Sequence, residues 1–414
     1  MPVGQIFEAA IKQRLSLALR PLVLLLALLG ALNSASAAPS FETVAPTAVL
    51  VDHDTHAILF DKNADERYPP ASLAKLMTVE LLFRELKEGR ISLDDEFPVS
   101  ERAWREGGAQ SGGSTMFLPV NSSVSVRDLI RGIVIQSGND ATIVVAEALG
   151  GTEEKFAEQM TERAKALGMT DSTFRNSHGL PDPEQRVTMR DLAVLASHLI
   201  REYPEFYKYF GEEEFTYNEI TQRNRNPLLD MGADGLKTGY TSEAGYGLVA
   251  SVERDSRRLI VAVGHLSSAS ARTEEARKLV EWGFRSFENR TLHQADDQVG
   301  EMEVLGGAAA TVPVVVRSGV VVTVPRGAED LHTILHRDEP LQAPVAEGDR
   351  VGWLQVVSAG DVIREDPVHA AAAVEPASFV SRTWGLATSY LWSTWDDTWA
   401  FVFPPKEVAS TGSP

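Results

Sequence analysis

The sequence contains no cysteine among its 414 residues. Disulfides, thiolate metal sites, iron–sulfur clusters and a cysteine nucleophile are therefore excluded. This absence is compatible with export to an oxidising compartment but does not establish it. Basic residues are also few, because 39 Lys and Arg face 58 Asp and Glu, giving a formal net charge of −19. Phosphate backbones would repel so acidic a chain, and we expect no nucleic-acid partner.

The composition is otherwise that of a soluble globular protein, and the N-terminus suggests export. Three basic residues precede an apolar run at 22–32, which is too short for a comfortable membrane span. Small residues then follow at 35–37, as a signal peptidase requires. We expect residues 1–37 to be a signal peptide and the mature chain to begin at Ala38. The alternative is an uncleaved N-terminal anchor.

The C-terminal segment holds four of the seven tryptophans. Its large apolar residues, between 384 and 402, recur at the spacing of one helix face. Indole rings favour the headgroup boundary of a bilayer, so residues 367–414 predict a linker and an amphipathic helix on the inner-membrane surface. The alternative is a helix that docks on the protein's own second domain.

Two domains are expected between these ends. Helical and strand patterns mix without a repeat over 38–290, which predicts one α/β domain. Valine-rich segments at 311–324 and 351–363, each with a tight turn, predict hairpins of a small all-β domain over 291–366. In the first domain we expect a hairpin at 48–60, helices at 71–87, 126–135, 142–149 and 272–287, and strands at 235–241, 247–251 and 259–264.

The first of three short motifs is Ser72-Leu73-Ala74-Lys75, at a predicted helix start. Positions i and i+3 share a helix face, so the Lys75 amine can reach the Ser72 hydroxyl. A desolvated lysine with a lowered pKa can take the hydroxyl proton. The Ser72 backbone N–H, unpaired at a helix N-terminus, can stabilise an oxyanion. Alone, this spacing is common in ordinary helices.

The second motif, Ser137-Gly138-Asn139, interrupts two apolar helices. Ser137 could pass a proton to a leaving amine, and the Asn139 amide could hold a substrate carbonyl. The plain alternative is a helix C-cap followed by an N-cap.

The third motif, Lys237-Thr238-Gly239, lies in a predicted edge strand. We expect the missing side chain at Gly239 to let an extended peptide lie alongside. Lys237 would supply positive charge, Thr238 a hydroxyl for a carboxylate, and Tyr240 a backbone N–H for an oxyanion. A surface turn is the alternative.

In this order the three motifs are similar to the signature S-x-x-K, S-D-N and K-T-G of class A β-lactamases and penicillin-binding proteins, with Gly138 in place of the Asp of the second motif. With further segments at 64–78, 174–183, 220–229 and 272–288, the chain resembles the low-molecular-mass penicillin-binding proteins that are serine-type D-alanyl-D-alanine carboxypeptidases of peptidase family S11. The resemblance implies the α/β (α+β) fold class, a β-lactamase/transpeptidase-like domain whose antiparallel sheet is flanked by helices.

The resemblance also implies roles for individual residues. Ser72 is the acyl-ester nucleophile, Lys75 the proton acceptor and Ser137 a second-serine relay. The implied substrate contacts are Asn139, Lys237, Thr238, Gly239, Tyr240, Arg225 and Arg272. No metal or other cofactor is implied. The Ser-Gly-Asn form of the second motif, in place of Ser-Asp-Asn, argues against a class A β-lactamase. Tyr240 stands where many relatives have His. His178 is expected to be a structural turn residue.

The implied activity removes the terminal D-Ala from peptidoglycan pentapeptide in the periplasm, and β-lactams would acylate the same serine. A D,D-endopeptidase that cuts crosslinks could use the same residues. A β-lactamase is disfavoured by the extra β domain and terminal helix. From another class, a non-catalytic peptidoglycan-binding protein would work through those two parts alone.

Overall fold

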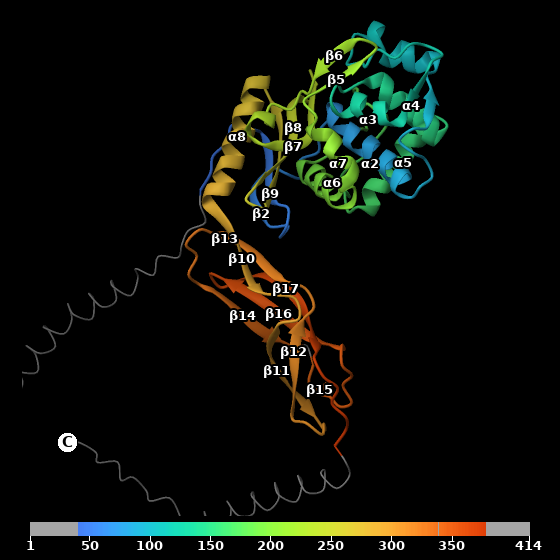
Figure 1. The fold of residues 1–414 in the computed structure, drawn as a ribbon. Coiled ribbons are helices and arrows are strands. Elements are labelled where there is room, and N and C mark those ends of the chain that lie inside the picture. Colours follow the sequence, from blue (N-terminus) through green and yellow to red (C-terminus); the bar gives the residue numbers. More distant parts are fainter. Residues whose placement is uncertain (1–39, 338, 378–414) are drawn as a thin grey trace, which may run out of the picture.

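The computed structural model describes residues 40–337 and 339–377. A domain of helices around a sheet is followed by an elongated domain of strands (Figure 1). The expected signal peptide lies outside the described residues, as does the expected amphipathic helix. Within the described part, no helix has the length and apolar character needed to cross a bilayer.

A five-stranded antiparallel sheet, in the order β2-β1-β9-β8-β7, forms the middle layer of the first domain. Its strands are β1 (Thr47–Asp52), β2 (Ile58–Lys62), β7 (Ala233–Thr241), β8 (Gly245–Arg254) and β9 (Arg257–Leu266). The expected hairpin at 48–60 and the three expected strands are confirmed. Because β7 is the last strand in the sheet order, the motif strand is an edge strand, as predicted.

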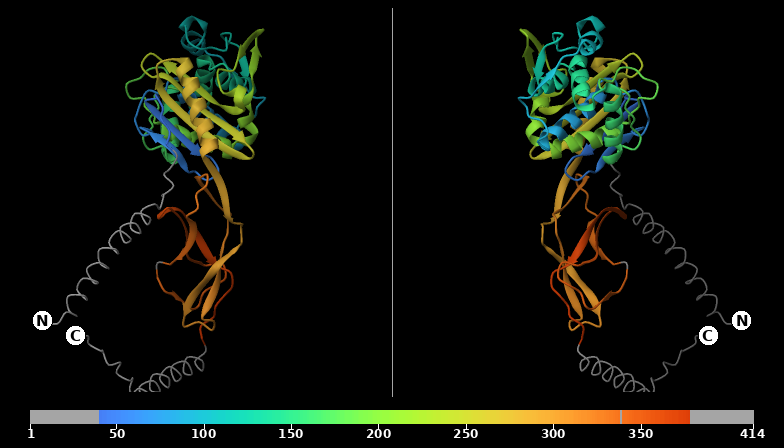
Figure 2. Two further views of the ribbon diagram at one scale, coloured as in Figure 1. Left: turned by 90° about the vertical axis from the view of Figure 1, so that its left-hand side faces the viewer. Right: turned by 90° about the vertical axis from the view of Figure 1, so that its right-hand side faces the viewer.

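Both faces of this sheet are buried. Neighbouring residues of a strand point to opposite sides, so each strand contributes to two cores. On β9, Ile260 and Ala262 join the larger core, whereas Val261 and Val263 pack toward α8. Helix α8 (Ala269–Ser286) therefore covers one face of the sheet, and the other helices gather on the opposite face (Figures 1 and 2). The expected antiparallel sheet flanked by helices is confirmed.

The helices of the larger core also carry the first two motifs. They are α2 (Lys75–Lys87), α3 (Val126–Val134), α4 (Asn139–Gly150), α5 (Glu153–Ala166), α6 (Met189–Glu202) and α7 (Pro204–Tyr207). The shorter elements are the helical turns η1 (Ala71–Ala74), η2 (Ala103–Gly107), η3 (Ala109–Ser111), η4 (Lys208–Gly211) and η5 (Leu229–Met231), with strands β3 (Glu96–Pro98), β4 (Ser123–Ser125), β5 (Glu214–Tyr217) and β6 (Ile220–Arg223). The predicted helices agree with these bounds to within a few residues.

The second domain packs a six-stranded sheet, β14-β16-β17-β12-β11-β15, with the pair β10-β13 around a valine-rich core. Its strands are β10 (Phe287–His293), β11 (Gln298–Leu305), β12 (Thr311–Val316), β13 (Val320–Pro325), β14 (Leu331–His336), β15 (Leu341–Gln342), β16 (Arg350–Ser358) and β17 (Asp361–Ala370). The expected small all-β domain is therefore present, and the hairpin predicted at 351–363 is confirmed by the pairing of β16 with β17.

The hairpin predicted at 311–324 is wrong. β12 pairs with β11 and β17, whereas β13 pairs with β10, so residues 317–319 carry the chain from one sheet to the other. Val314, Val315 and Val316 are all buried, which means that both faces of β12 are covered. A run of valine marks a buried strand but does not say which strand it pairs with.

The end of the β domain also differs from the prediction, which started a linker at residue 367. β17 continues to Ala370, and isolated bridges at Val374 and Pro376 hold the chain to the domain. Pro367 is tolerated inside β17 because β12 pairs with this strand only from Val368 onward. The proline therefore lies where one side of the strand is unpaired.

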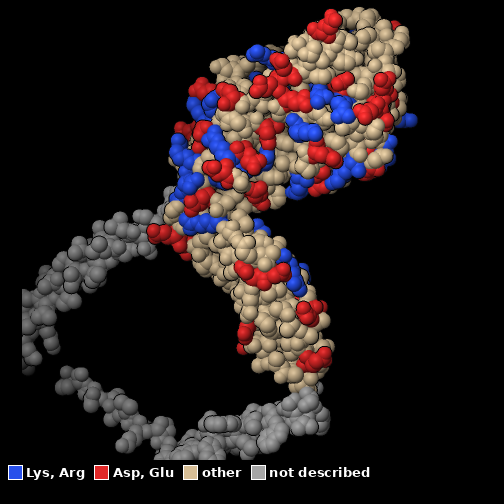
Figure 3. All heavy atoms as spheres, viewed as in Figure 1, with Lys and Arg blue, Asp and Glu red and all other residues tan. Residues whose placement is uncertain are grey.

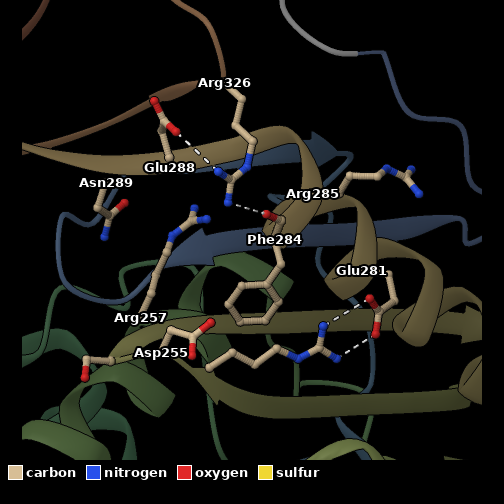
Figure 4. Close-up of a pocket in the computed structure, with 10 residues that line it drawn as sticks. Asp255, Arg257, Glu281, Phe284, Arg285, Glu288, Asn289 and Arg326 are labelled. Atoms are coloured by element: carbon tan, nitrogen blue, oxygen red, sulfur yellow. Dashed lines mark hydrogen bonds and ion pairs between the residues drawn. The ribbon is translucent and has the colours of Figure 1, made fainter.

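A buried polar network joins the two domains. The Asp52 carboxylate accepts hydrogen bonds from Arg257 Nε at 2.8 Å and from Asn289 Nδ2 at 3.2 Å. A cavity of about 560 Å³ opens beside it, and Arg254 pairs with Glu281 in its wall. Figure 4 shows a second pair there, between Arg326 and Glu288. None of the residues of the three motifs lines this larger cavity. In Figure 3, acidic and basic side chains are interspersed over the visible face of the first domain.

Candidate active site

The serine and lysine of the first motif meet as their spacing predicts. Ser72 lies in the 3-10 turn η1 and Lys75 begins α2, with Lys75 Nζ 3.1 Å from Ser72 Oγ. A Cβ added to Gly179 would lie 1.8 Å from the Ala71 carbonyl oxygen, so only glycine fits there. Backbone packing thus fixes the turn that presents Ser72.

The Lys75 amine is enclosed by hydrogen-bond acceptors. Besides Ser72, it donates to Asn139 Oδ1 at 2.7 Å and to the His178 carbonyl oxygen at 2.6 Å. The residue is 1% exposed. Burial, assisted by the positive charge of Arg225, lowers the pKa of Lys75 to about 7. A substantial fraction of Lys75 is therefore a free amine at neutral pH.

The second motif forms a strained buried break between α3 and α4. Ser137 has a φ of 64° and is 1% exposed, and Gly138 precedes α4 without a side-chain cap. Within the described part of the chain, the Ser137 hydroxyl has no hydrogen-bond partner. A plain pair of helix caps would not require this arrangement, and buried unpaired polar atoms in strained backbone often mark functional sites.

Asp140 fixes a loop over the site that sequence reasoning missed. Its carboxylate accepts hydrogen bonds from Thr115 Oγ1 at 2.6 Å and from the backbone N–H groups of Met116 and Leu118 at 3.0 and 3.1 Å. The Asn139 N–H donates to the Ser114 carbonyl oxygen at 2.8 Å. The only signal in the sequence was an acidic residue beside the motif at the start of an apolar helix.

The third motif brings a second buried lysine to the site. Lys237 is buried in β7 and donates to the Thr238 carbonyl oxygen at 2.9 Å. Burial lowers its pKa well below the usual value, and the positive charges of Lys75, Arg225 and Arg272 lower it further. Two lysines from remote parts of the chain thus lie close enough to influence each other.

Gly239 has a different structural role from the one expected. A Cβ at this position would lie 3.1 Å from Leu73 Cγ, 3.1 Å from the Pro70 carbonyl oxygen and 3.3 Å from Ala71 Cβ. The missing side chain therefore lets β7 approach η1, rather than making room for a ligand strand. Sequence alone could not reveal which neighbour required the glycine.

A cavity of about 310 Å³ opens where these elements meet. The residues that line it are Ser72, Gly112, Gly113, Ser114, Asn139, His178, Gly179, Leu180, Arg225, Tyr240 and Thr241. Lys75, Ser137 and Lys237 are buried rather than among these lining residues. The nucleophile candidate thus faces the cavity, with the candidate proton carriers largely shielded from water.

The two predicted arginines lie in different places. Arg225 lines the cavity and donates through Nη1 to Ser114 Oγ at 2.6 Å. Arg272 does not line it, and its guanidinium carbon lies 5.8 Å from the Tyr246 ring centroid. Tyr246 in turn stacks on the exposed Tyr240, with ring centroids 4.2 Å apart. Arg225 is therefore better placed to meet a ligand in the cavity.

His178 contributes its backbone rather than a catalytic ring. Its Nδ1 accepts the Leu180 N–H at 3.1 Å, and its Nε2 lies 3.4 Å from Glu153 Oε1. Burial lowers the pKa of the ring to about 4. The imidazole is thus a neutral turn element, in keeping with the expected structural role, while its carbonyl oxygen holds Lys75.

Comparisons with known proteins agree with this geometry. The family model of the D-alanyl-D-alanine carboxypeptidases, peptidase S11, matches residues 33–266. The chain belongs to this family. The model of the C-terminal domain of penicillin-binding protein 5 matches residues 287–376. The resemblance drawn from the three motifs is thereby confirmed, as are the serine-hydrolase class and the fold.

Individual relatives extend over most of the chain. D-alanyl-D-alanine carboxypeptidase DacC of Escherichia coli is 40% identical over 342 residues, which cover 81% of this chain and 86% of the relative. DacA of Haemophilus influenzae is 36% identical over 349 residues, covering 83% and 88%. The crystal structure of penicillin-binding protein 5 from H. influenzae matches with a TM-score of 0.76 at 36% identity, covering 81% of this chain and 99% of that one.

Proposed function

We propose that this S11 family member is a D-alanyl-D-alanine carboxypeptidase that removes the terminal D-Ala from peptidoglycan pentapeptide through a Ser72 acyl-enzyme. One observation carries the assignment: a buried Lys75 amine with a pKa of about 7 lies 3.1 Å from a serine hydroxyl on a cavity wall. Such an amine can act as a general base for a serine nucleophile.

Acylation begins when Lys75 Nζ takes the Ser72 hydroxyl proton. Ser72 Oγ then attacks the carbonyl carbon of the D-Ala–D-Ala bond, and the carbonyl oxygen becomes an oxyanion. The backbone N–H groups of Ser72 and Tyr240 stabilise this oxyanion. Collapse of the intermediate breaks the C–N bond and leaves the acyl group on Ser72.

The leaving D-Ala amine needs a proton, and Ser137 passes it. Its hydroxyl is buried and without a protein partner in the described chain, two residues from the Asn139 that binds Lys75. The Lys75 ammonium replaces the proton that Ser137 donates, so Lys75 returns to the free amine. Water then attacks the acyl ester with Lys75 again as the base, and Ser72 is regenerated.

Substrate recognition uses the positive charges around the cavity. The terminal carboxylate of the substrate binds Arg225, whose planar guanidinium matches a carboxylate, together with Lys237 and Thr238. The peptide lies extended along the free edge of β7. β-Lactams present a similar carbonyl and should acylate the same serine. The structure of Penicillin-Binding Protein D2 of Listeria monocytogenes has been solved in an ampicillin-bound form. It is 31% identical, with a TM-score of 0.52, and the match covers 59% of this chain and 99% of that one.

The location in the cell follows from the two ends of the sequence. Residues 1–37 direct export to the periplasm, and the tryptophan-rich segment near the C-terminus binds the inner-membrane surface. The last described residues lie at the end of the β domain away from the first domain (Figure 1). An anchor there would hold the catalytic cavity at a distance from the bilayer. N-terminal sequencing of the exported protein tests cleavage before Ala38. Fractionation of a chain that ends at residue 377 tests membrane binding, which this shorter chain should lose.

The activity is tested with a fluorescent penicillin and two peptide substrates. We expect stoichiometric labelling that is lost in Ser72→Ala and retained in Ser358→Ala, a control in the β domain. We also expect D-Ala release from pentapeptide. Cleavage of a crosslinked dimer alone would favour an endopeptidase, rapid penicillin turnover a β-lactamase, and absence of labelling a binding protein.

A further inference from the structure

Glu153 is a buried carboxylate that the reaction scheme does not use. It is the first residue of α5 and is 4% exposed. Its Oε1 accepts hydrogen bonds from the Ser177 N–H at 2.9 Å and the Ser177 hydroxyl at 2.6 Å. The same oxygen lies 3.4 Å from His178 Nε2, and Oε2 accepts from Arg102 Nη2 at 2.8 Å. A buried charge with this many partners specifies a local geometry.

The turn that Glu153 holds is bonded to α2 on its other side. The Ser177 carbonyl oxygen accepts from Thr78 Oγ1 at 2.6 Å, and the His178 carbonyl oxygen accepts from Lys75 Nζ at 2.6 Å. The two consecutive carbonyls thus bond to Lys75 and Thr78, which are about one helical turn apart on α2. The N–H and hydroxyl of Ser177 face Glu153 instead. The next residue along the chain, Gly179, packs directly on the backbone before Ser72.

We propose that Glu153 is a positioning residue for Lys75, because it fixes the 177–178 turn whose carbonyl oxygen holds the Lys75 amine. The inference rests on the proposed function, in which Lys75 is the base that activates Ser72. Glu153 acts through the turn: it does not contact Ser72 and does not itself line the cavity, although its neighbour His178 does. Its effect reaches the reaction through the position of this turn and through the position and protonation of Lys75.

The charge of Glu153 also bears on the protonation of Lys75. Burial and Arg225 lower the pKa of Lys75, whereas Asp140 on α4 and Glu153 on α5 oppose that lowering. Lys237 on β7 is a further charged neighbour, and the positive charge of Lys75 helps to lower the pKa of Lys237. Removing only the charge of Glu153 should therefore lower the pKa of Lys75, and more free amine would be present under acidic conditions.

The test measures the acylation rate of the full-length enzyme by a fluorescent penicillin between pH 5.5 and pH 9. His178, with its pKa of about 4, stays neutral over this range and does not contribute to the acidic limb, and only the shift of the limb on removing the Glu153 charge is used here. In Glu153→Gln the amide oxygen still accepts from Ser177, and we expect a near-normal plateau with the limb moved to lower pH by about 0.5 unit or more. In Glu153→Ala the turn loses its acceptor, and we expect the plateau to fall about tenfold or more.

Glu154→Gln is the matched control, because Glu154 is the next residue, lies 3.6 Å from Arg102 and has a side chain that is 71% exposed. We expect it to leave the profile unchanged. Arg102→Gln changes a partly exposed residue and serves as a second test if the buried variants do not fold. It removes the positive charge that partly offsets Glu153, so the pKa of Lys75 should rise and the acidic limb of the profile should move to higher pH.

Identical profiles for Glu153→Gln and Glu154→Gln would overturn the inference, as would an Arg102→Gln limb that stays in place or moves to lower pH. A wild-type enzyme that is not labelled at all would instead contradict the proposed function. The two failures are thereby distinguishable.

Discussion

Replacing Gly239 by alanine tests whether the approach of β7 to η1 builds the catalytic geometry. The added Cβ would lie 3.1 Å from Leu73 Cγ and 3.3 Å from Ala71 Cβ, and 3.1 Å from the Pro70 carbonyl oxygen. Comfortable carbon–carbon contacts are about 3.5–4.0 Å, so strand and turn must separate by roughly 0.3–0.5 Å. Overpacking of this kind lowers the free energy of unfolding by about 1–3 kcal/mol.

The larger consequence is for catalysis, because Ser72 lies on the turn and Thr238 on the strand. Sub-ångström misplacement of reacting groups lowers rates steeply, and we expect acylation by penicillin to slow by about 10- to 100-fold. The melting temperature should fall by about 2–12 °C. Gly319→Ala is the control, since its Cβ would meet only the His293 carbonyl oxygen, at 3.7 Å. A Gly239→Ala enzyme with wild-type acylation would refute the reasoning.

Two further predictions concern buried charges. With a pKa of about 7, Lys75 is a free amine in roughly a tenth of molecules at pH 6 and in roughly nine-tenths at pH 8. The acylation rate of the wild-type enzyme should therefore rise about tenfold between these two pH values. A flat profile would contradict the role of Lys75 as the base. Glu80 is fully buried, and its carboxylate accepts hydrogen bonds from Arg163 Nε at 2.8 Å and from Tyr203 Oη at 3.0 Å. Glu80→Gln should therefore lower the free energy of unfolding by about 3 kcal/mol, and the melting temperature by roughly 6–12 °C. A fall in melting temperature of less than about 2 °C would contradict this prediction.

The parts of the fold that the sequence predicted are those with a local signature. The 48–60 hairpin, the helix starting near Ser72 and the strands around residues 247–264 depend on periodicity and turn residues, which short windows contain. The valine run at 311–324 carried the same signal, yet its two strands belong to different sheets. Pairing is decided by residues far along the chain, and no short window contains it.

The candidate site divides in the same way. The i,i+3 contact between Ser72 and Lys75 is a property of helix geometry and could be predicted. The loop held by Asp140 and the turn held by Glu153 could not, because their partners lie 22 to 25 residues away in the chain and show no motif. Family resemblance identified the residues of the motifs, but it did not say that Gly239 serves packing against η1.

The chemistry of Lys75 is accordingly a property of the whole domain rather than of its motif. An exposed lysine three residues after a serine would keep its proton at neutral pH and could not serve as a base. Here the amine is enclosed by Asn139 from α4 and the His178 carbonyl from a remote turn, and Arg225 supplies an opposing charge. Each enclosing group depends on its own supports, so changes far from the three motifs can alter the fraction of free amine while Ser72 stays in place. Relatives that share all three motifs can therefore differ in the pH dependence of acylation.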